Sequence, residues 1–305
     1  MRTFRFYQVD VFCDRPLEGN PLAFFPDGEG LQDSEMQALA REMGLSETTF
    51  VLPSDAATRR VRFFTPAAEI PFAGHPTIGT WWGLAELGRL DLPRDGGAQV
   101  TQETGAGVLP VEIGMAGGKP SAVIMTQAHP RFGTEVTDTG LLAAALGGDD
   151  TLIARDLAPQ VVSTGLPQMM IPVRSLDALS QLPIGGKGSE LAALLKRFGT
   201  DCAMCYTLET ESQEATVHCR MFAPGLGVPE DPATGSAAGA LGCYLVRNKV
   251  IQPEGTTATV IVEQGIEIGR PSRIEVKIAL GPDGAIAKVR VGGRAITVIE
   301  GEVRL

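Results

Sequence analysis

The spacing of apolar and polar positions divides the chain into short strands and a few helices. Residues 4–12 mix β-branched and aromatic side chains with polar ones, which predicts a strand. Residues 34–43 predict an amphipathic helix with Asp33 or Ser34 as its N-cap and Gly44 as its stop. The apolar positions of that helix, at the i, i+3, i+4, i+7 spacing, are Met36, Leu39, Ala40 and Met43.

The same criteria predict further elements along the whole chain. Helices are expected at residues 76–87, closed by Gly88, and at residues 189–198 and 233–246. Strands are expected at residues 48–52, 60–64, 108–111, 122–125, 205–209, 215–221, 259–263, 273–279, 287–291 and 295–299. The first 125 residues are therefore expected to be rich in strands, with two helices, and the second half repeats this plan loosely.

An internal repeat indicates two related halves. Arg62-Phe63-Phe64-Thr65-Pro66, with Pro71 after it, recurs at an offset of 158 residues as Arg220-Met221-Phe222-Ala223-Pro224, with Pro229 after it. A period of about half the chain suggests two domains, and chance similarity is the alternative. We expect an N-terminal domain of residues 1–127, completed by the C-terminal strand at 295–305, and a C-terminal domain of residues 128–294.

Glycine is over-represented, with 37 residues among 305, against about 7% in average proteins. The helices expected at 76–87 and 233–246 are apolar on almost every face.

The glycines of these two helices recur three or four positions apart on one face. They are Gly79 and Gly83 in the first helix, and Gly235, Gly239 and Gly242 in the second. Glycine inside a helix costs about 1 kcal/mol relative to alanine. Close contact with a surrounding sheet would compensate, so we predict a helix enclosed by a curled sheet in each domain; the alternative is an Ala-rich surface helix.

Charge and cysteine content limit the partners. The 36 acidic and 26 basic residues leave a net charge of −10 with no basic run, which disfavours nucleic acid and anionic membranes as partners. No stretch reaches 18 apolar residues, which argues against a membrane span. No signal-peptide pattern is present, and the odd number of cysteines, five, is not that of a disulfide framework. The expectation is a cytoplasmic protein that does not span a membrane.

Cys202, Cys205, His218 and Cys219 have a zinc-like spacing. His218 and Cys219 are adjacent in an expected strand, however, and would point to opposite faces. Buried core cysteines are therefore favoured over a zinc site, and no metal is expected.

The two repeat turns each lead into a helix N-terminus, which is a ready site for a small anion. His75 lies in the first turn, and Asp231 and Ser236 lie in the second. If the domains face each other about a pseudo-twofold axis, both termini converge on one cleft that could hold a carboxylate. The plain alternatives are a capping Asp and a surface His.

Glu47 is a third candidate, because it follows the helix stop at Gly44 and precedes the apolar residues 50–52. In an apolar cleft, desolvation would raise its pKa toward that of a working general base. The alternative is an ordinary solvated Glu near a helix end.

These residues belong to motifs that resemble the PhzF-like family of phenazine biosynthesis proteins, within the diaminopimelate epimerase-like superfamily. The motifs run in the family order over essentially the whole chain. They are Gly19-Asn20-Pro21-Leu22-Ala23, Ser46-Glu47-Thr48-Thr49-Phe50-Val51, residues 62–66 with 71–77, Glu230-Asp231-Pro232-Ala233-Thr234-Gly235-Ser236-Ala237, and Gln264-Gly265 with 269–272. The resemblance implies an α+β fold like that of diaminopimelate epimerase, with two pseudo-symmetric domains, each a barrel-like sheet around a central helix, and the active site between them.

The resemblance also implies an isomerase that transfers a proton without a cofactor. The position of Glu47 matches the acid/base of trans-2,3-dihydro-3-hydroxyanthranilate isomerase. His75 and Asp231 match residues that orient the substrate. The Gly74-His75 and Gly235-Ser236 turns match those that hold the carboxylate of a small anionic substrate, and family members are commonly homodimers.

Epimerases of this fold use two cysteines at the paired turns, where this chain has none, so two-thiol racemisation is disfavoured. An epimerase using Glu47 with Asp231 or His75 stays an alternative, as does a non-catalytic binding protein.

Overall fold

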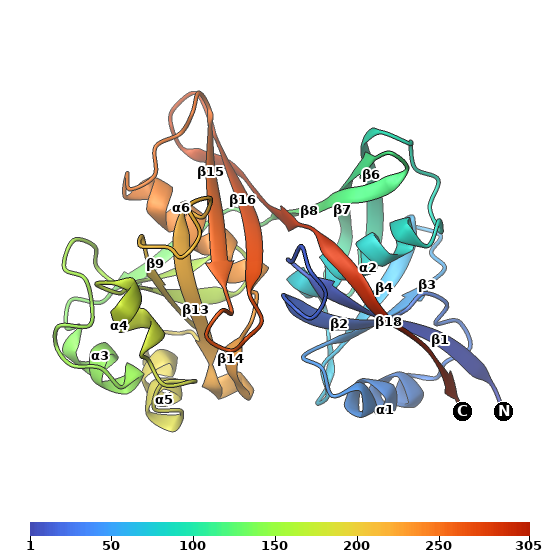
Figure 1. Cartoon of the computed structure of the whole chain (residues 1–305), viewed down its shortest axis with the longest axis horizontal. Helices are drawn as coiled ribbons and strands as arrows, with labels where there is room; N and C mark the ends of the chain where they lie inside the picture. Colours follow the sequence, from blue (N-terminus) through green and yellow to red (C-terminus); the bar gives the residue numbers. More distant parts are fainter. The chain divides into compact units, whose positions relative to one another are not determined.

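A computed structural model describes residues 1–305, and its contacts divide the chain into two compact units (Figure 1). The first unit comprises Met1–Met125 and Gly292–Leu305, and the second comprises Thr126–Val291. The domain boundaries expected from the sequence lie within three positions of these ends. The domain assignment itself stays a prediction.

The first unit contains a mixed sheet and two helices. Its elements are β1 (Thr3–Val11), β2 (Asn20–Phe25), α1 (Asp33–Met43), β3 (Thr48–Leu52), β4 (Arg59–Phe64), β5 (Glu69–Ile70), α2 (Gly74–Glu86), β6 (Gly96–Thr104), β7 (Gly107–Ala116), β8 (Lys119–Gln127) and β18 (Ala295–Arg304). The two ends of the chain meet in this unit, because Thr3 of β1 pairs with Arg304 of β18 (Figure 1).

The second unit has similar elements, with two additional α-helices and one 3₁₀ turn. Its elements are β9 (Arg131–Glu135), α3 (Gly140–Leu146), β10 (Gln160–Ser163), β11 (Pro167–Pro172), α4 (Leu176–Ser180), α5 (Ser189–Arg197), β12 (Ala203–Thr207), β13 (Val217–Ala223), the 3₁₀ turn η1 (Pro224–Leu226), β14 (Val228–Asp231), α6 (Gly235–Arg247), β15 (Thr257–Gln264), β16 (Ser272–Leu280) and β17 (Ile286–Gly293).

Strand pairing follows the same order in both units. In the first, β1 is antiparallel to β18 and β2, β2–β3 is parallel, β3–β4 antiparallel, β4–β6 parallel and β6–β7 antiparallel. In the second, β10 is antiparallel to β9 and β11, β11–β12 is parallel, β12–β13 antiparallel, β13–β15 parallel and β15–β16 antiparallel. The repeat seen in a few residues therefore extends through the topology of both units.

The repeated arginines make equivalent contacts. Arg62 on β4 makes a two-pronged hydrogen-bonded pair with Glu69 at 2.8 and 2.7 Å, and its guanidinium lies 5.1 Å from the ring centre of Phe64. Arg220 on β13 pairs with Glu230 at 2.8 and 2.6 Å and lies 5.1 Å from the ring centre of Phe222. Each pair ties the repeat strand to the segment that leads into a central helix.

The central helices α2 and α6 are buried on almost every face, as the glycine pattern predicts. Every residue of α2 from His75 to Ala85 is buried. A Cβ atom added to Gly83 would lie 2.3 Å from the ring of Phe24 on β2, and one added to Gly242 would lie 2.9 Å from Val276 on β16. The sheets approach these helices so closely that only glycine fits at such contacts.

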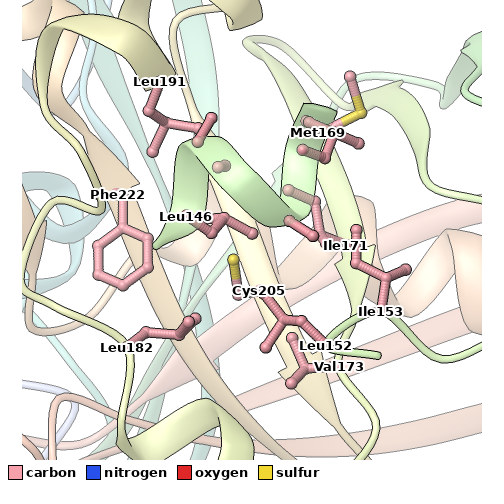
Figure 2. Packing of buried hydrophobic residues seen from close by; sticks show 14 of the residues in the cluster. Leu146, Leu152, Ile153, Met169, Ile171, Val173, Leu182, Leu191, Cys205 and Phe222 are labelled. Carbon is pink, nitrogen blue, oxygen red and sulfur yellow. The ribbon is translucent and has the colours of Figure 1, made fainter. Parts of the chain in front are cut away.

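The remaining helices cover the outer faces of the sheets. In the second unit α3, α4 and α5 bury one large apolar cluster against β11, β12 and β13, and Figure 2 shows Cys205 within it, among Leu146, Leu152 and Ile171. In the first unit α1 buries Met36, Leu39 and Ala40 against aromatic residues of the strands. All five cysteines are buried and none forms a disulfide, which agrees with the interpretation as core cysteines.

Several expected boundaries are wrong, for local reasons. The N-cap of α1 is Gln32, not Asp33 or Ser34, because Gln32 and Glu35 form a reciprocal capping box. The helix expected at 76–87 begins earlier, at Gly74, since helix propensity disfavours a glycine that tertiary packing accommodates there. The helix expected at 233–246 begins later, at Gly235, because Thr234 is extended and acts as its N-cap. No helix is long and apolar enough to cross a membrane.

Candidate active site

Glu47 lies in the short connection between α1 and β3. Gly44 ends α1 in the left-handed conformation, with φ 64°, and turns the chain so that β3 starts at Thr48. The Glu47 side chain is 18% exposed. Burial raises the pKa of its carboxyl above the ordinary value of 4.5, and the hydrogen bond with Ser46 opposes that rise only partly. A carboxyl in this environment holds a proton more readily than a solvated one.

His75 is the second residue of α2 and lies beside Glu47. Its Nε2 is 3.6 Å from Oε2 of Glu47, longer than a hydrogen bond but close enough for electrostatic coupling. The buried hydroxyls of Thr49 on β3 and Thr80 on α2 are joined by a hydrogen bond of 2.7 Å. This bond ties the strand that follows Glu47 to the helix that carries His75.

A buried glutamine supports the start of α2. Gln102 on β6 accepts a hydrogen bond from Trp81 Nε1 at 2.9 Å and donates one to the Thr77 hydroxyl at 3.3 Å. Thr77 in turn donates to the carbonyl of Ala73 at 2.8 Å. The first turn of α2, with Gly74 and His75, is thereby fixed to the sheet.

In the second unit, Asp231 ends β14 and Thr234 directly precedes α6. The Thr234 hydroxyl donates a hydrogen bond to Oδ2 of Asp231. Gln264 at the end of β15 bonds both to Thr234 and to the backbone of Asp231. Asp231 is therefore held at a defined place before the helix.

The first turn of α6 contains Gly235 and Ser236. Gln127, the last residue of β8, belongs to the second unit; it donates to the Gly235 carbonyl at 2.9 Å and accepts from the Thr164 hydroxyl at 2.6 Å. Gly239 leaves room for Gln127, because a Cβ atom there would lie 2.0 Å from the glutamine Oε1. The first N–H groups of a helix have no partner within the helix, and no acidic residue lies in this first turn, so an anion can bind there.

A buried charge cluster lies beside Gln264. His218 on β13 is fully buried, and its ring nitrogens lie 2.8 Å from Glu263 and 2.9 Å from Glu267. At the equivalent register of the first unit, Arg60 pairs with Glu103 at 3.8 Å, with about half of the arginine side chain exposed. Both units therefore place a basic residue opposite a glutamate at this register, and only the pair in the second unit is buried.

This cluster predicts a pH dependence of stability. Burial alone would lower the pKa of His218, but the bonds to Glu263 and Glu267 outweigh it and raise the pKa to about 9. A raised histidine pKa stabilises the fold fully below pH 6.5 and loses that contribution as the pH rises through about 9. The free energy of unfolding, measured by urea titration, should therefore fall between pH 6.5 and 10. The fall should be larger in the parent protein than in a His218→Gln variant. Cysteines and tyrosines titrate in both proteins, so their contributions cancel in the comparison. An equal dependence of the free energy of unfolding on pH in the two proteins would contradict the raised pKa of His218.

The structure brings the candidate residues together within each unit. Glu47, Gly74 and His75 lie together in the first, and Asp231, Gly235 and Ser236 lie together in the second. No three His, Cys, Asp or Glu side chains form a cluster that could hold a metal ion. The sequence did not reveal Gln102, Thr234 and Gln264 as supports. Gln102 lies among other polar residues of β6, and the roles of Thr234 and Gln264 depend on contacts between distant segments.

The family of this chain follows from comparison with known proteins. Residues 9–301 match the PhzC-PhzF family model, described as phenazine biosynthesis-like protein. The chain is a PhzF-family protein. It is 34% identical to an uncharacterized isomerase of Clostridium acetobutylicum, over 100% of this chain and 99% of the relative. It is also 35% identical to the trans-2,3-dihydro-3-hydroxyanthranilate isomerase of Pseudomonas aeruginosa, over 99% of each chain. This PhzF-family protein is an isomerase.

Solved structures confirm the fold class. A PhzF-family phenazine biosynthesis protein from Bacillus anthracis matches with a TM-score of 0.91 and 31% identity, over 100% of both chains. A hydroxyproline epimerase from Agrobacterium vitis shares the fold with a TM-score of 0.64 and 15% identity, over 99% of this chain and 92% of the epimerase. The PhzF-family protein therefore has the epimerase-like α+β fold expected from its sequence.

Proposed function

We propose that this PhzF-family protein moves a proton between two carbons of a small carboxylate-bearing substrate, with Glu47 as general acid and base. The reaction would resemble that of trans-2,3-dihydro-3-hydroxyanthranilate isomerase, the name carried by a relative of 35% identity. The observation that carries the proposal is the environment of Glu47, a largely buried carboxyl with a raised pKa beside His75.

The proton balance needs no further reactant. The Glu47 carboxylate accepts a proton from one carbon, the electron pair of the broken C–H bond shifts the double bonds, and the carboxylic acid returns the proton to a second carbon. A raised pKa supports both steps, because it brings the acid and base forms closer to equal population near neutral pH. His75 and Asp231 orient the substrate in this proposal.

A substrate carboxylate would bind at the helix starts. The first turns of α2 and α6 contain no acidic residue and direct backbone N–H groups outward along the helix axis. The Gly74-His75 and Gly235-Ser236 turns are the proposed contacts. Such local positive ends allow an anion to bind although the net charge of the chain is −10.

Thiol chemistry is disfavoured by the state of the cysteines. Burial raises the pKa of Cys202, Cys205 and Cys243 to about 12 and that of Cys219 well above its ordinary value. None of the five cysteines lies in either turn. A thiolate base at the two turns, as in two-cysteine racemisation, therefore has no candidate residue.

The test uses trans-2,3-dihydro-3-hydroxyanthranilate in D₂O, followed by ultraviolet absorption and proton NMR. We expect loss of the substrate with a shift of its double bonds and hydrogen or deuterium at a new carbon. A second arm uses chiral amino and hydroxy acids: deuterium at a stereocentre with loss of optical activity would replace the isomerase proposal by the epimerase alternative. Absence of turnover and of deuterium uptake in both arms would overturn the proposal.

A further inference from the structure

The side chain of Gln264 connects the end of β15 to the turn that carries Asp231. Gln264 is fully buried. Its Oε1 accepts from the backbone N–H of Thr234 at 3.3 Å, and its Nε2 donates to the carbonyl of Asp231 at 2.6 Å and to the Thr234 hydroxyl at 3.1 Å. One amide thus spans the whole turn from Asp231 to Thr234.

The Thr234 hydroxyl lies between the Gln264 amide and the Asp231 carboxylate and is hydrogen-bonded to both. It accepts from Gln264 Nε2 and donates its own proton to Oδ2 of Asp231. A hydroxyl has only one proton to donate, so occupation of its acceptor side by Gln264 directs that proton toward the carboxylate. The orientation of the Asp231 side chain therefore depends on the amide behind it.

The backbone of Gln264 is itself fixed against the turn. The single hydroxyl proton of Ser272 is shared between the carbonyls of Pro232 and Gln264, which lie 3.0 and 3.1 Å from the hydroxyl oxygen. Gly265 has φ 78°, and a Cβ atom there would lie 2.5 Å from the carbonyl oxygen of Pro232. The turn and the end of β15 are packed backbone to backbone, which leaves little freedom for either.

The chemistry of the position requires both halves of an amide. A glutamate would keep an acceptor for the Thr234 N–H but lose both donors, and an apolar side chain would lose all three hydrogen bonds. Leaving buried backbone groups unpaired is unfavourable, because they lose their hydrogen bonds to water without gaining others. The first unit uses a buried glutamine in a similar way, since Gln102 on β6 bonds to Thr77 in the first turn of α2.

We infer that Gln264 is a positioning residue: through Thr234 it fixes the orientation of the Asp231 carboxylate, and it orders the turn before α6 for substrate binding. The inference rests on the proposed function for the role of Asp231. The hydrogen-bond network that carries the inference is independent of which substrate is turned over.

The first test removes the amide without changing the length of the side chain. In Gln264→Met, the N–H of Thr234 should exchange with D₂O about tenfold faster, because it loses a hydrogen bond worth on the order of 1.4 kcal/mol. The matched control is Gln160→Met: Gln160 is also a buried amide of the second unit, but it bonds to the carbonyl of Gly133 on β9. The control should leave exchange at residues 231–236 unchanged.

The second test measures coupling to Asp231 with trans-2,3-dihydro-3-hydroxyanthranilate at saturating concentration, well below the unfolding temperature. Gln264→Met should lower kcat at least tenfold and Gln160→Met should not. In an Asp231→Asn background, Gln264→Met should cause no further loss, since both changes remove the same contribution. If the two substitutions lower kcat by factors that multiply in the double variant, Gln264 acts independently of Asp231, and the inference is overturned.

The two proposals fail in different ways. If the substrate is not turned over at all, the proposed function fails, and the exchange experiment still decides whether Gln264 orders the turn. If turnover is normal in Gln264→Met, or Thr234 exchange is unchanged, the inference fails while the proposed function stands. Gln264→Glu, which keeps the volume and one acceptor, replaces the methionine variant if that variant does not fold.

Discussion

Replacing Glu47 with Gln should lower the rate of proton transfer by about 10²–10⁴-fold, the range that a general acid or base contributes. The amide has nearly the same shape as the carboxyl but cannot take or return a proton. The measurement is kcat with trans-2,3-dihydro-3-hydroxyanthranilate, together with deuterium uptake in D₂O. Substrate affinity should change little, because the proposed carboxylate contacts lie at the starts of α2 and α6.

The same variant should be more stable than the parent at neutral pH. Burial raises the pKa of Glu47, so the folded state disfavours its ionised form and the fold loses stability as the pH rises above 4.5. Glutamine carries no such penalty, so its unfolding midpoint in urea should be higher at pH 7. A slower and more stable protein is the signature of a residue kept for function.

Glu42→Gln is the control for Glu47→Gln. Glu42 lies on the exposed face of α1, close to Glu47 in sequence, so its replacement makes the same chemical change in a solvated place. Activity and stability should both stay within experimental error of the parent. Full turnover by Glu47→Gln would remove the central residue of the proposed mechanism.

Arg220→Leu should reduce the free energy of unfolding by about 3–5 kcal/mol, the cost of leaving one partner of a buried ion pair alone. The side chains of Arg220 and Glu230 are 1% and 2% exposed. Arg220 also donates to the carbonyls of Leu179, Ser180 and Leu182. The Glu230 carboxylate and the carbonyls of Leu179 and Leu182 would be buried without this donor. Urea unfolding at pH 7 measures the loss.

The internal repeat supplies the control for Arg220→Leu. Arg62 makes the same two-pronged pair, but its partners Glu69 and Asp33 are 43% and 83% exposed, so Arg62→Leu should cost about 1 kcal/mol or less. Both variants lose an arginine–phenylalanine contact of the same length, and that loss cancels in the comparison. Equal costs at the two positions would show that burial is not what separates them.

The elements that the sequence predicted well are those whose signal is local. Apolar spacing and Gly44 locate α1 within one residue, because the helix buries one face and ends in a left-handed glycine. β10 and β11 were not predicted. β11 begins and ends in proline and carries the polar Gln168 among buried residues, so neither alternation nor a continuous apolar run marks it.

The candidate residues were singled out by motif and by the repeat, whereas their supports were not. Gln264 reaches Asp231 because β13 and β15 pair in parallel, with Cys219 opposite Gln264. Such a contact between positions 33 apart depends on sheet register and side-chain packing. The burial of His218 between two glutamates depends on the same register, and no local pattern distinguishes it from the exposed Arg60 pair.

The closing strand of the first unit has a consequence for how the chain is made. Residues 126–291 form the second unit from one continuous stretch, whereas the sheet of the first unit needs β18 beside β1. During synthesis, β1 leaves the ribosome nearly 300 residues before its partner, so the second unit can complete its folding while the first still exposes the edge of β1. An unpaired strand edge is a site for incorrect association, and the β1 edge stays open to it until β18 has been synthesised.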